Sequence, residues 1–455
     1  MNLRESRSTL LHLLFVMKNK LIILFFVFPF LIGANEIIVP LSTTQSLIPI
    51  YCEKFSSLDG TFPSSYLQSL EEVLKFDLNF FGTIYVLPTS YTIEENLENS
   101  RIFVLKPEFK KNTLSITLYS NKNGRSYPLN NFILSGQLCS DRRIMHQMAD
   151  FVYNTITGKK GIATTRILYA LQTHSQEDDQ GISWESAIWA ADYDGANAIK
   201  LTDEKNYCIT PLFFPSNHNL SSRKFLYVSY KLGQPKIFAS SIGERQGNPI
   251  IPLRGNQLLP AFSPKGDMMA FISDASGSAD LFIQPFHSET GPSGKPIQIY
   301  SFTSSVQASP TFRPDGKKIA FVSDKDGTPR IYLIDLPSPT KKSTSKLFCL
   351  TKKNRENTCP SWSPDGTKLA YSARIDGIRQ IMIYDFLSKE EFQLTTGLEH
   401  KENPCWSPNS LHIIFNSVGH SSSELFIISI DKKEMIQITS GSGKKHYPAW
   451  EPYFN

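Results

Sequence analysis

The sequence predicts a small N-terminal α/β domain followed by a six-bladed β-propeller. Three observations lead to this fold class. A Pro-x-aromatic segment recurs six times in the second half of the chain, at intervals of 44 to 50 residues. Each interval also holds patterns for further short strands, and four strands in that length are typical of one propeller blade. Residues 35–160 lack the repeat and mix strand patterns with two helical ones.

The first 34 residues have the pattern of an export signal. Two lysines precede the apolar run from Leu21 to Ile32, and the small residues Gly33 and Ala34 follow it. A membrane-spanning helix needs about 20 apolar residues, whereas a signal peptide needs a charged start, a shorter apolar core and a small-residue cleavage site. We therefore expect a signal peptide that begins at Met1 or Met17 and is cleaved after Ala34. The alternatives are a buried strand and an uncleaved membrane anchor.

Composition and cysteine content limit the possible classes of function. The formal net charge is only +5, and much of it lies in the expected signal peptide. A near-neutral mature chain lacks the basic surface of a nucleic-acid-binding protein. The six cysteines are scattered, without a C-x-x-C pair or the spacing of a metal site. They are typical of small buried residues, although export permits disulfides, and Cys52 with Cys139 is the candidate pair.

Residues 35–160 are interpreted as one mixed α/β domain. Ser65 with Gln68 can form a capping box at the start of a first helix. Its apolar face would consist of Leu67, Leu70, Val73 and Leu74. The expected strands are Glu36–Leu41, Ser46–Cys52, Thr83–Leu87, Arg101–Lys106, Leu114–Ser120 and Asn131–Leu138.

A second helix is expected toward the end of this domain. Asp141 can cap its N-terminus, and Gly158 can end it. Its inward positions would be Ile144, Met148, Phe151, Val152 and Ile156. Residues 158–164 then serve as the linker to a propeller domain that covers 165–455.

The repeats are interpreted as blades of four strands. The Pro-x-aromatic segment is the first strand, and its Pro-Asp-Gly or Pro-Lys-Gly ending favours a tight turn. Two alternating strands follow, and a short fourth strand tends to end in Leu-Thr or a close variant. The first prolines of the six segments are Pro211, Pro260, Pro310, Pro360, Pro404 and Pro448.

The two ends of the repeat region complete each other. The last Pro-x-aromatic segment stops at Asn455 with no strands behind it. Conversely, three strand patterns from Arg166 onward have no such segment before them. We therefore expect the C-terminal segment to supply the first strand of a blade that begins at Arg166. Such closure removes exposed sheet edges.

Three local motifs carry a resemblance to a known family. They are NTITGKKGIATTRILYALQT from Asn154, AADYDG ending at Gly195, and PAWEPYF from Pro448. With the propeller repeats, they resemble the TolB family of the Tol–Pal cell-envelope system over essentially the whole mature chain. The segments 215–217 and 408–410 depart from the family pattern because they lack the Asp-Gly turn. These departures concern single hairpins.

The resemblance implies a periplasmic, non-enzymatic scaffold without a cofactor. Such a protein would bind the peptidoglycan-associated lipoprotein Pal through its propeller and TolA through its mature N-terminus. It would act as a monomer within a larger envelope complex, without nucleic acid or a small-molecule substrate. The family's role is outer-membrane integrity and invagination during cell division.

The expected partner sites lie in two places. In the family the mouth of the propeller channel receives Pal, and Glu402 matches the family's acidic position there. The other residues predicted for this mouth lie one or two positions before the first prolines: Thr210, Ser309, Thr358, Asn403, His446 and Tyr447. By resemblance, Glu36, Ile37 and Ile38 would contact TolA, because an apolar strand-competent segment can add to a sheet edge. The alternatives are that the former only shape turns and that the latter pair within their own domain.

Two other functions of a propeller are weighed against this scaffold role. A propeller-type peptidase needs a G-x-S-x-G elbow, and the nearest string, Gly419–Ser423, lacks the final glycine. A glycan-binding propeller would use exposed aromatic residues. Trp362, Trp406 and Trp450 occupy the repeat position itself, however, and are better explained as packing between blades.

Overall fold

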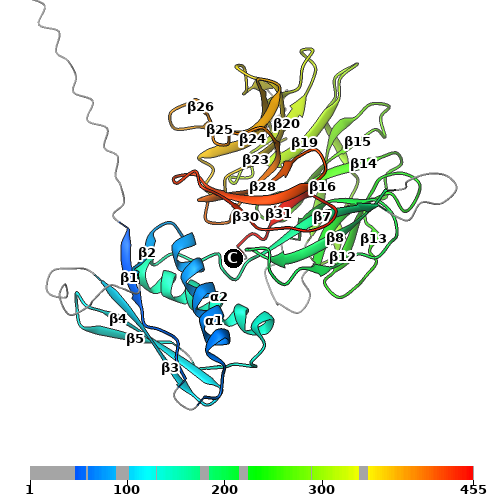
Figure 1. Cartoon of the computed structure of the whole chain (residues 1–455). Coiled ribbons are helices and arrows are strands. Elements are labelled where there is room, and N and C mark those ends of the chain that lie inside the picture. The colour runs from blue at the N-terminus through cyan, green and yellow to red at the C-terminus, as the bar shows by residue number, and fades with distance from the viewer. Residues whose placement is uncertain are drawn as a thin grey trace, which may run out of the picture. The chain divides into compact units, whose positions relative to one another are not determined.

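The computed structural model describes residues 47–57, 60–88, 102–129, 131–174, 184–214, 224–287, 289–337 and 347–453. The described residues before 158 form one sheet and two helices (Figure 1). These elements are β1 (Ile48–Cys52), α1 (Ser64–Phe80), β2 (Ile84–Val86), β3 (Phe103–Lys110), β4 (Thr113–Ser120), β5 (Arg125–Pro128), β6 (Phe132–Ile133) and α2 (Leu138–Thr157). The sheet order is β2-β1-β3-β4-β5, with β6 paired to β4. β1 lies parallel to both of its neighbours.

The core of this region lies between the helices and the sheet. Leu70 and Leu78 of α1, Met145 and Met148 of α2, and Ile116 of β4 are each at most 1% exposed. They belong to one apolar cluster. The three- and four-residue spacings along each helix place these side chains on a single face, so the periodicity seen in the sequence is the face that packs.

Both predicted helix caps are wrong. Helix α1 begins at Ser64 after Pro63, with no side-chain cap, and Gln68 instead donates to Glu72 one turn later. Proline is favoured at a helix start because its φ angle is already suitable and no N–H is lost from the ladder. Helix α2 begins at Leu138, so Asp141 lies inside the first turn. Its carboxylate accepts backbone N–H groups from Ser135 and the following residue, and thus fixes the chain that enters the helix.

The C-terminal end of α2 agrees with the prediction except at one position. Gly158 ends the helix with a left-handed φ of 70°, a conformation that glycine adopts without a steric penalty. Phe151 was expected to face inward, but it is 43% exposed. It precedes the buried Val152 by one residue, which turns it about 100° away from the buried stripe.

Residues 166–450 form the sheets of a β-propeller (Figure 1). One sheet is β10 (Cys208–Phe213), β11 (Lys224–Ser229), β12 (Lys236–Ser241) and β13 (Asn248–Pro249). The next consists of β14 (Gln257–Phe262), β15 (Met268–Ser273), β16 (Asp280–His287), β17 (Gly291–Pro292) and β18 (Ile297–Tyr300). Two more are β19 (Gln307–Phe312), β20 (Lys318–Ser323), β21 (Arg330–Asp335) and β22 (Phe348–Cys349), and then β23 (Arg355–Trp362), β24 (Lys368–Ile375), β25 (Ile378–Asp385) and β26 (Glu390–Gln393).

The last sheet contains both ends of the repeat region. It combines β27 (His400–Trp406), β28 (His412–Val418), β29 (Ser423–Ser429), β30 (Met435–Gln437) and β31 (Lys444–Trp450) with β7 (Arg166–His174), β8 (Trp184–Asp192) and β9 (Ile199–Lys200). A single parallel pair, Ser423 with Lys444, joins β29 to β31. Strand β31 is antiparallel to β7 and pairs with it from Lys444 to Trp450. The C-terminal strand therefore shares a sheet with strands almost 300 residues earlier in the chain.

The Leu-Thr pairs that end the fourth strands have a defined structural role. In Leu394-Thr395 the leucine is 4% exposed, and the threonine hydroxyl accepts the backbone N–H of Ile381 at 2.8 Å. Thr202, Thr351 and Thr439 make the same contact with Ile188, Ile331 and Leu425. Because a buried N–H must find an acceptor, the hydroxyl completes the hydrogen bonding of the neighbouring strand.

Trp362 and Trp406 pack between neighbouring sheets, as predicted. Trp450 instead belongs to an apolar cluster with Ile167 and Ile414 of its own eight-stranded sheet. Trp362, Trp406 and Trp450 are only 4% to 6% exposed. The indole N–H of Trp406 donates to the carbonyl of Ser361 in the preceding sheet, at 3.0 Å. Buried rings of this kind offer no stacking platform to a sugar, and this weakens the glycan-binding alternative.

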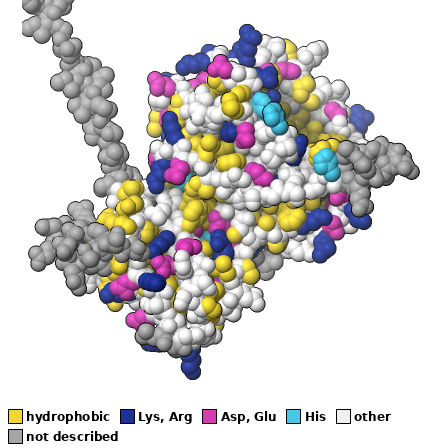
Figure 2. Space-filling view, in the orientation of Figure 1, with side chains coloured by type: hydrophobic (Ala, Val, Ile, Leu, Met, Phe, Trp, Pro, Cys, Tyr) yellow, Lys and Arg dark blue, Asp and Glu magenta, His cyan; other side chains and the backbone are white. Residues whose placement is uncertain are grey.

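The structure contradicts the predicted disulfide and mixes charges of both signs on the face shown in Figure 2. Cys52 is buried and Cys139 is exposed, and all six cysteines are free thiols, so the suggested bridge is wrong. Figure 2 shows Lys and Arg interspersed with Asp and Glu on the visible face, in keeping with the small net charge. None of the helices among the described residues has the length and apolar character needed to cross a bilayer.

Candidate partner-binding site at the centre of the propeller

The first strand of each repeat is bulged around its first proline. The pairing of β10 with β11 shifts register between Ile209 and Leu212, and equivalent shifts occur in β14, β19, β23, β27 and β31. In all six strands the residue before the proline has a φ between 46° and 53°: Thr210, Leu259, Ser309, Cys359, Asn403 and Tyr447. Non-glycine residues rarely adopt this conformation, and bulges that re-aim a side chain are common next to functional sites.

These six bulges converge on one cavity. The residues with positive φ, together with the prolines that follow them, line a space of about 170 Å³. The structure therefore brings four of the predicted mouth residues together: Thr210, Ser309, Asn403 and Tyr447. They lie within strands, not in the connections between blades where we expected them, because each bulge turns its own strand inward.

The cavity lining is uncharged, with apolar surface from six prolines and Leu259 beside five residues that carry polar groups. It contains hydroxyl, thiol, amide and phenol groups but no Asp, Glu, His, Lys or Arg. Burial raises the pKa of Cys359, so its thiol remains protonated and donates to Oδ1 of Asn403 at 3.2 Å. Burial also raises the pKa of Tyr447 to about 12. This lining can exchange hydrogen bonds with a bound group, and it holds no general base to activate a nucleophile.

Thr358, Glu402 and His446 are not among the residues that line the cavity. The Thr358 hydroxyl is buried without a hydrogen-bond partner among the described residues. Burial lowers the pKa of His446, which favours the neutral imidazole. Glu402 binds Arg379 through a 3.1 Å contact between Oε1 and Nη1.

Sequence reasoning missed the cation that faces Glu402. Arg379 also approaches Glu356 at 3.8 Å, and Glu356 binds Arg374 at 2.7 Å. Arg374 and Arg379 are paired directly across the β24–β25 hairpin. A cross-strand match at the Asp376-Gly377 turn was the signal that could have found them, because residues opposite each other in a hairpin share a face.

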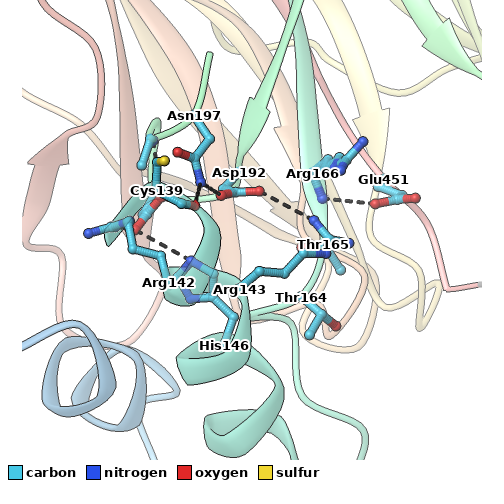
Figure 3. A network of polar contacts seen from close by, with 12 residues as sticks. Cys139, Arg142, Arg143, His146, Thr164, Thr165, Arg166, Asp192, Asn197 and Glu451 are labelled. Atoms are coloured by element: carbon cyan, nitrogen blue, oxygen red, sulfur yellow. Dashed lines mark hydrogen bonds and ion pairs between the residues drawn. The ribbon is translucent and has the colours of Figure 1, made fainter. Parts of the chain in front are cut away.

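The AADYDG motif has a separate structural role at the end of β8. Asp194 binds Arg142 of α2, and Asp192 lies 3.5 Å from Arg143. Asn197 donates to both Asp192 and the Cys139 carbonyl, at 2.7 and 2.9 Å (Figure 3). The turn after β8 is thus fastened to the first two turns of α2.

Comparison with known proteins agrees with this architecture. The profile of the family described as "TolB beta propeller domain" matches residues 153–454. This match covers more than half of the chain. The chain belongs to the TolB β-propeller family.

Individual relatives extend the comparison. The "Protein TolB homolog" of Protochlamydia amoebophila (strain UWE25) is 43% identical over 293 residues, which are 61% of this chain and 62% of that protein. The "Protein TolB homolog" of Chlamydia pneumoniae is 36% identical over 288 residues, 63% of this chain and 64% of that protein. The chain therefore matches less than two thirds of the length of these TolB homologues.

A solved structure shares the fold. The crystal structure of TolB from Acinetobacter baumannii has a TM-score of 0.69 and 21% identity, and the match covers 90% of this chain and 97% of that one. Among the described residues of this TolB-family chain, no group of three or more His, Cys, Asp or Glu residues could hold a metal ion. The predicted TolA-contacting residues Glu36, Ile37 and Ile38 lie outside the described residues.

Proposed function

We propose that this chain is the TolB component of a Tol–Pal system. It would be exported to the periplasm and act there as a non-enzymatic scaffold that supports outer-membrane integrity and invagination during division. Membership of the TolB family and the TolB homologues support this role. The uncharged lining of the central cavity also favours binding over catalysis.

The domain organisation is part of the same proposal. A signal peptide covers 1–34, an α/β domain 35–160 and a six-bladed propeller 165–455. The count of six rests on dividing the eight-stranded sheet in two, with β27 to β30 as one blade and β31, β7, β8 and β9 as the other. The single pair between β29 and β31 supports that division, since strands within one blade share several pairs.

Pal is the proposed partner of the propeller mouth. The observation that carries this assignment is the convergence of six strained residues on one cavity, because strained backbone conformations cluster at ligand-binding and active sites. Pal would contact Tyr447 and its neighbours in the lining, while Glu402 beside it would steer association through charge. Rim charges mainly affect association rates, whereas a desolvated tyrosine can act as an energetic anchor.

We expect the double substitution Glu402→Ala with Tyr447→Ala to weaken Pal binding by about 30-fold or more, the equivalent of about 2 kcal/mol. Isothermal titration calorimetry measures this directly. Tyr85→Ala is the matched control, because Tyr85 is 48% exposed on β2, far from the mouth in the chain. The melting temperature of each variant must also be measured. Unchanged affinity of the double variant would move the Pal interface elsewhere.

The mature N-terminus is proposed as the TolA-binding segment. Residues Glu36, Ile37 and Ile38 would form an added strand on a sheet edge of TolA. We expect deletion of Asn35–Ser42 to abolish measurable TolA binding while Pal binding is retained. Surface plasmon resonance with TolA and with Pal, on one preparation of the shortened protein, measures the loss of the first interaction and the retention of the second. Equal TolA affinity of the full-length and shortened proteins would rule the segment out.

A further inference from the structure

A buried polar cluster joins the two helices to the turn after β8. Asp77 of α1 and Tyr193 of that turn are fully buried, and His146 of α2 is 1% exposed. The Tyr193 hydroxyl donates to Oδ1 of Asp77 at 2.6 Å. Nδ1 of His146 lies 2.7 Å from Oδ2 of the same carboxylate. The Asp77 carboxylate thus contacts a side chain from α2 and another from the turn after β8.

The second nitrogen of His146 faces a different carboxylate. Nε2 lies 3.9 Å from Oδ2 of Asp194 and has no hydrogen-bond partner among the described residues. Asp194 in turn binds Arg142, one turn before His146 on α2. Asp192 at the end of β8 and Asp150 on α2 are the other nearby acidic groups. Acidic groups from α1, α2 and the turn therefore surround the imidazole.

We propose that His146 is a proton-dependent latch between the α1–α2 helices and the propeller. With both nitrogens protonated, the imidazolium bridges Asp77 on α1 and Asp194 on the β8 turn. When Nε2 loses its proton, a lone pair faces the Asp194 carboxylate, and the attraction becomes a repulsion. This conformational device is independent of the partners proposed above.

The charges around the imidazole set the direction of the pH dependence. Burial alone lowers the pKa of His146, but the hydrogen bond and charge of Asp77, with the charges of Asp194 and Asp192, outweigh it and raise that pKa. Burial also raises the pKa of Asp77. The pair therefore holds its proton to a higher pH than free histidine does. The stabilisation that protonated His146 contributes to the folded state is complete below about pH 6.5. It is lost as the pH rises through the raised pKa of His146.

The test is a titration of His146 by NMR in the full mature chain. In the wild type we expect its pKa to lie above the ordinary value of about 6.5. Asp194→Asn removes the charge that faces Nε2 and should lower the pKa of His146 by about one unit or more. A pKa at or below 6.5 in the wild type, or no shift in the Asp194→Asn variant, would overturn the proposal.

Hydrogen exchange supplies the conformational readout. Between pH 6 and pH 9 we expect protection of residues 138–157 and 192–197 to fall in the wild type, after correction for the intrinsic exchange rate. His146→Asn keeps a donor near Asp77 but cannot titrate, so its protection should not change with pH. His287→Asn, on β16, is the control and should follow the wild type. If His146→Asn shows the wild-type pH dependence, the latch is refuted. If that variant does not fold, the wild-type and Asp194→Asn titrations still decide the question.

Discussion

Deletion of residues 447–455 should abolish cooperative unfolding of the protein. The missing segment contains most of β31, which pairs with β7 and carries the buried Trp450. Loss of a buried tryptophan side chain alone costs about 3–5 kcal/mol, and the deletion also uncovers Ile167 and Leu168, both fully buried in the intact protein. Because domains are stable by only about 5–15 kcal/mol in total, little stability would remain. Calorimetry should show a broad transition without a single peak.

A shorter deletion is the matched control for this experiment. A chain that ends at Glu451 retains β31 and both hydrogen bonds between Glu451 and Arg166, each 2.9 Å long. It loses the bond from the Tyr453 hydroxyl to the Lys160 carbonyl, which is worth about 1 kcal/mol. This control should unfold in one transition. A 447–455 deletion that melts like the intact protein would contradict the role of β31 in closure.

Gly195→Ala should be among the most destabilising single methyl additions in the chain. A Cβ at this position would lie 1.7 Å from the backbone carbonyl oxygen of Ile438, and Gly195 has a φ of 86°. A backbone carbonyl cannot move aside as a flexible side chain can. We expect overpacking to cost roughly 1–3 kcal/mol beyond the penalty for the left-handed backbone. The disturbed turn also carries Tyr193 and Asp194, so contacts with α1 and α2 should loosen as well.

Gly327→Ala separates these two effects. Gly327 has the same φ of 86°, but nothing lies within 4 Å of the added methyl group. It should therefore cost only the backbone penalty of about 1–2 kcal/mol. Urea denaturation of both variants measures the difference in the free energy of unfolding. Equal losses would show that the carbonyl of Ile438 can move aside without cost and would refute the close contact as the cause.

Much of the propeller could be predicted from local sequence. The Pro-x-aromatic segments and the alternating strands follow from short-range chemistry that recurs in every repeat, and the threonine endings from chemistry that recurs in four of them. The same was true of the glycine at the end of α2. Helix starts were not predictable in this way, because Pro63 and the entering chain at Ser135 competed with the expected caps at Ser65 and Asp141.

The sequence predicted only part of the candidate site, because four of the seven residues predicted for the mouth line the cavity and three do not. The spacing of the repeats was enough to predict that the residue before each first proline occupies an equivalent place in every repeat. Thr210, Ser309, Asn403 and Tyr447 do meet at one cavity, as predicted, but the bulges that turn them inward and the pairing of Glu402 with Arg379 follow from the packed structure alone. The same holds for Asp77, His146 and Tyr193, which no motif connects. A repeated sequence pattern reflects the strands and turns within one blade. Contacts between distant segments depend instead on how the blades and helices pack, and no local pattern encodes that packing.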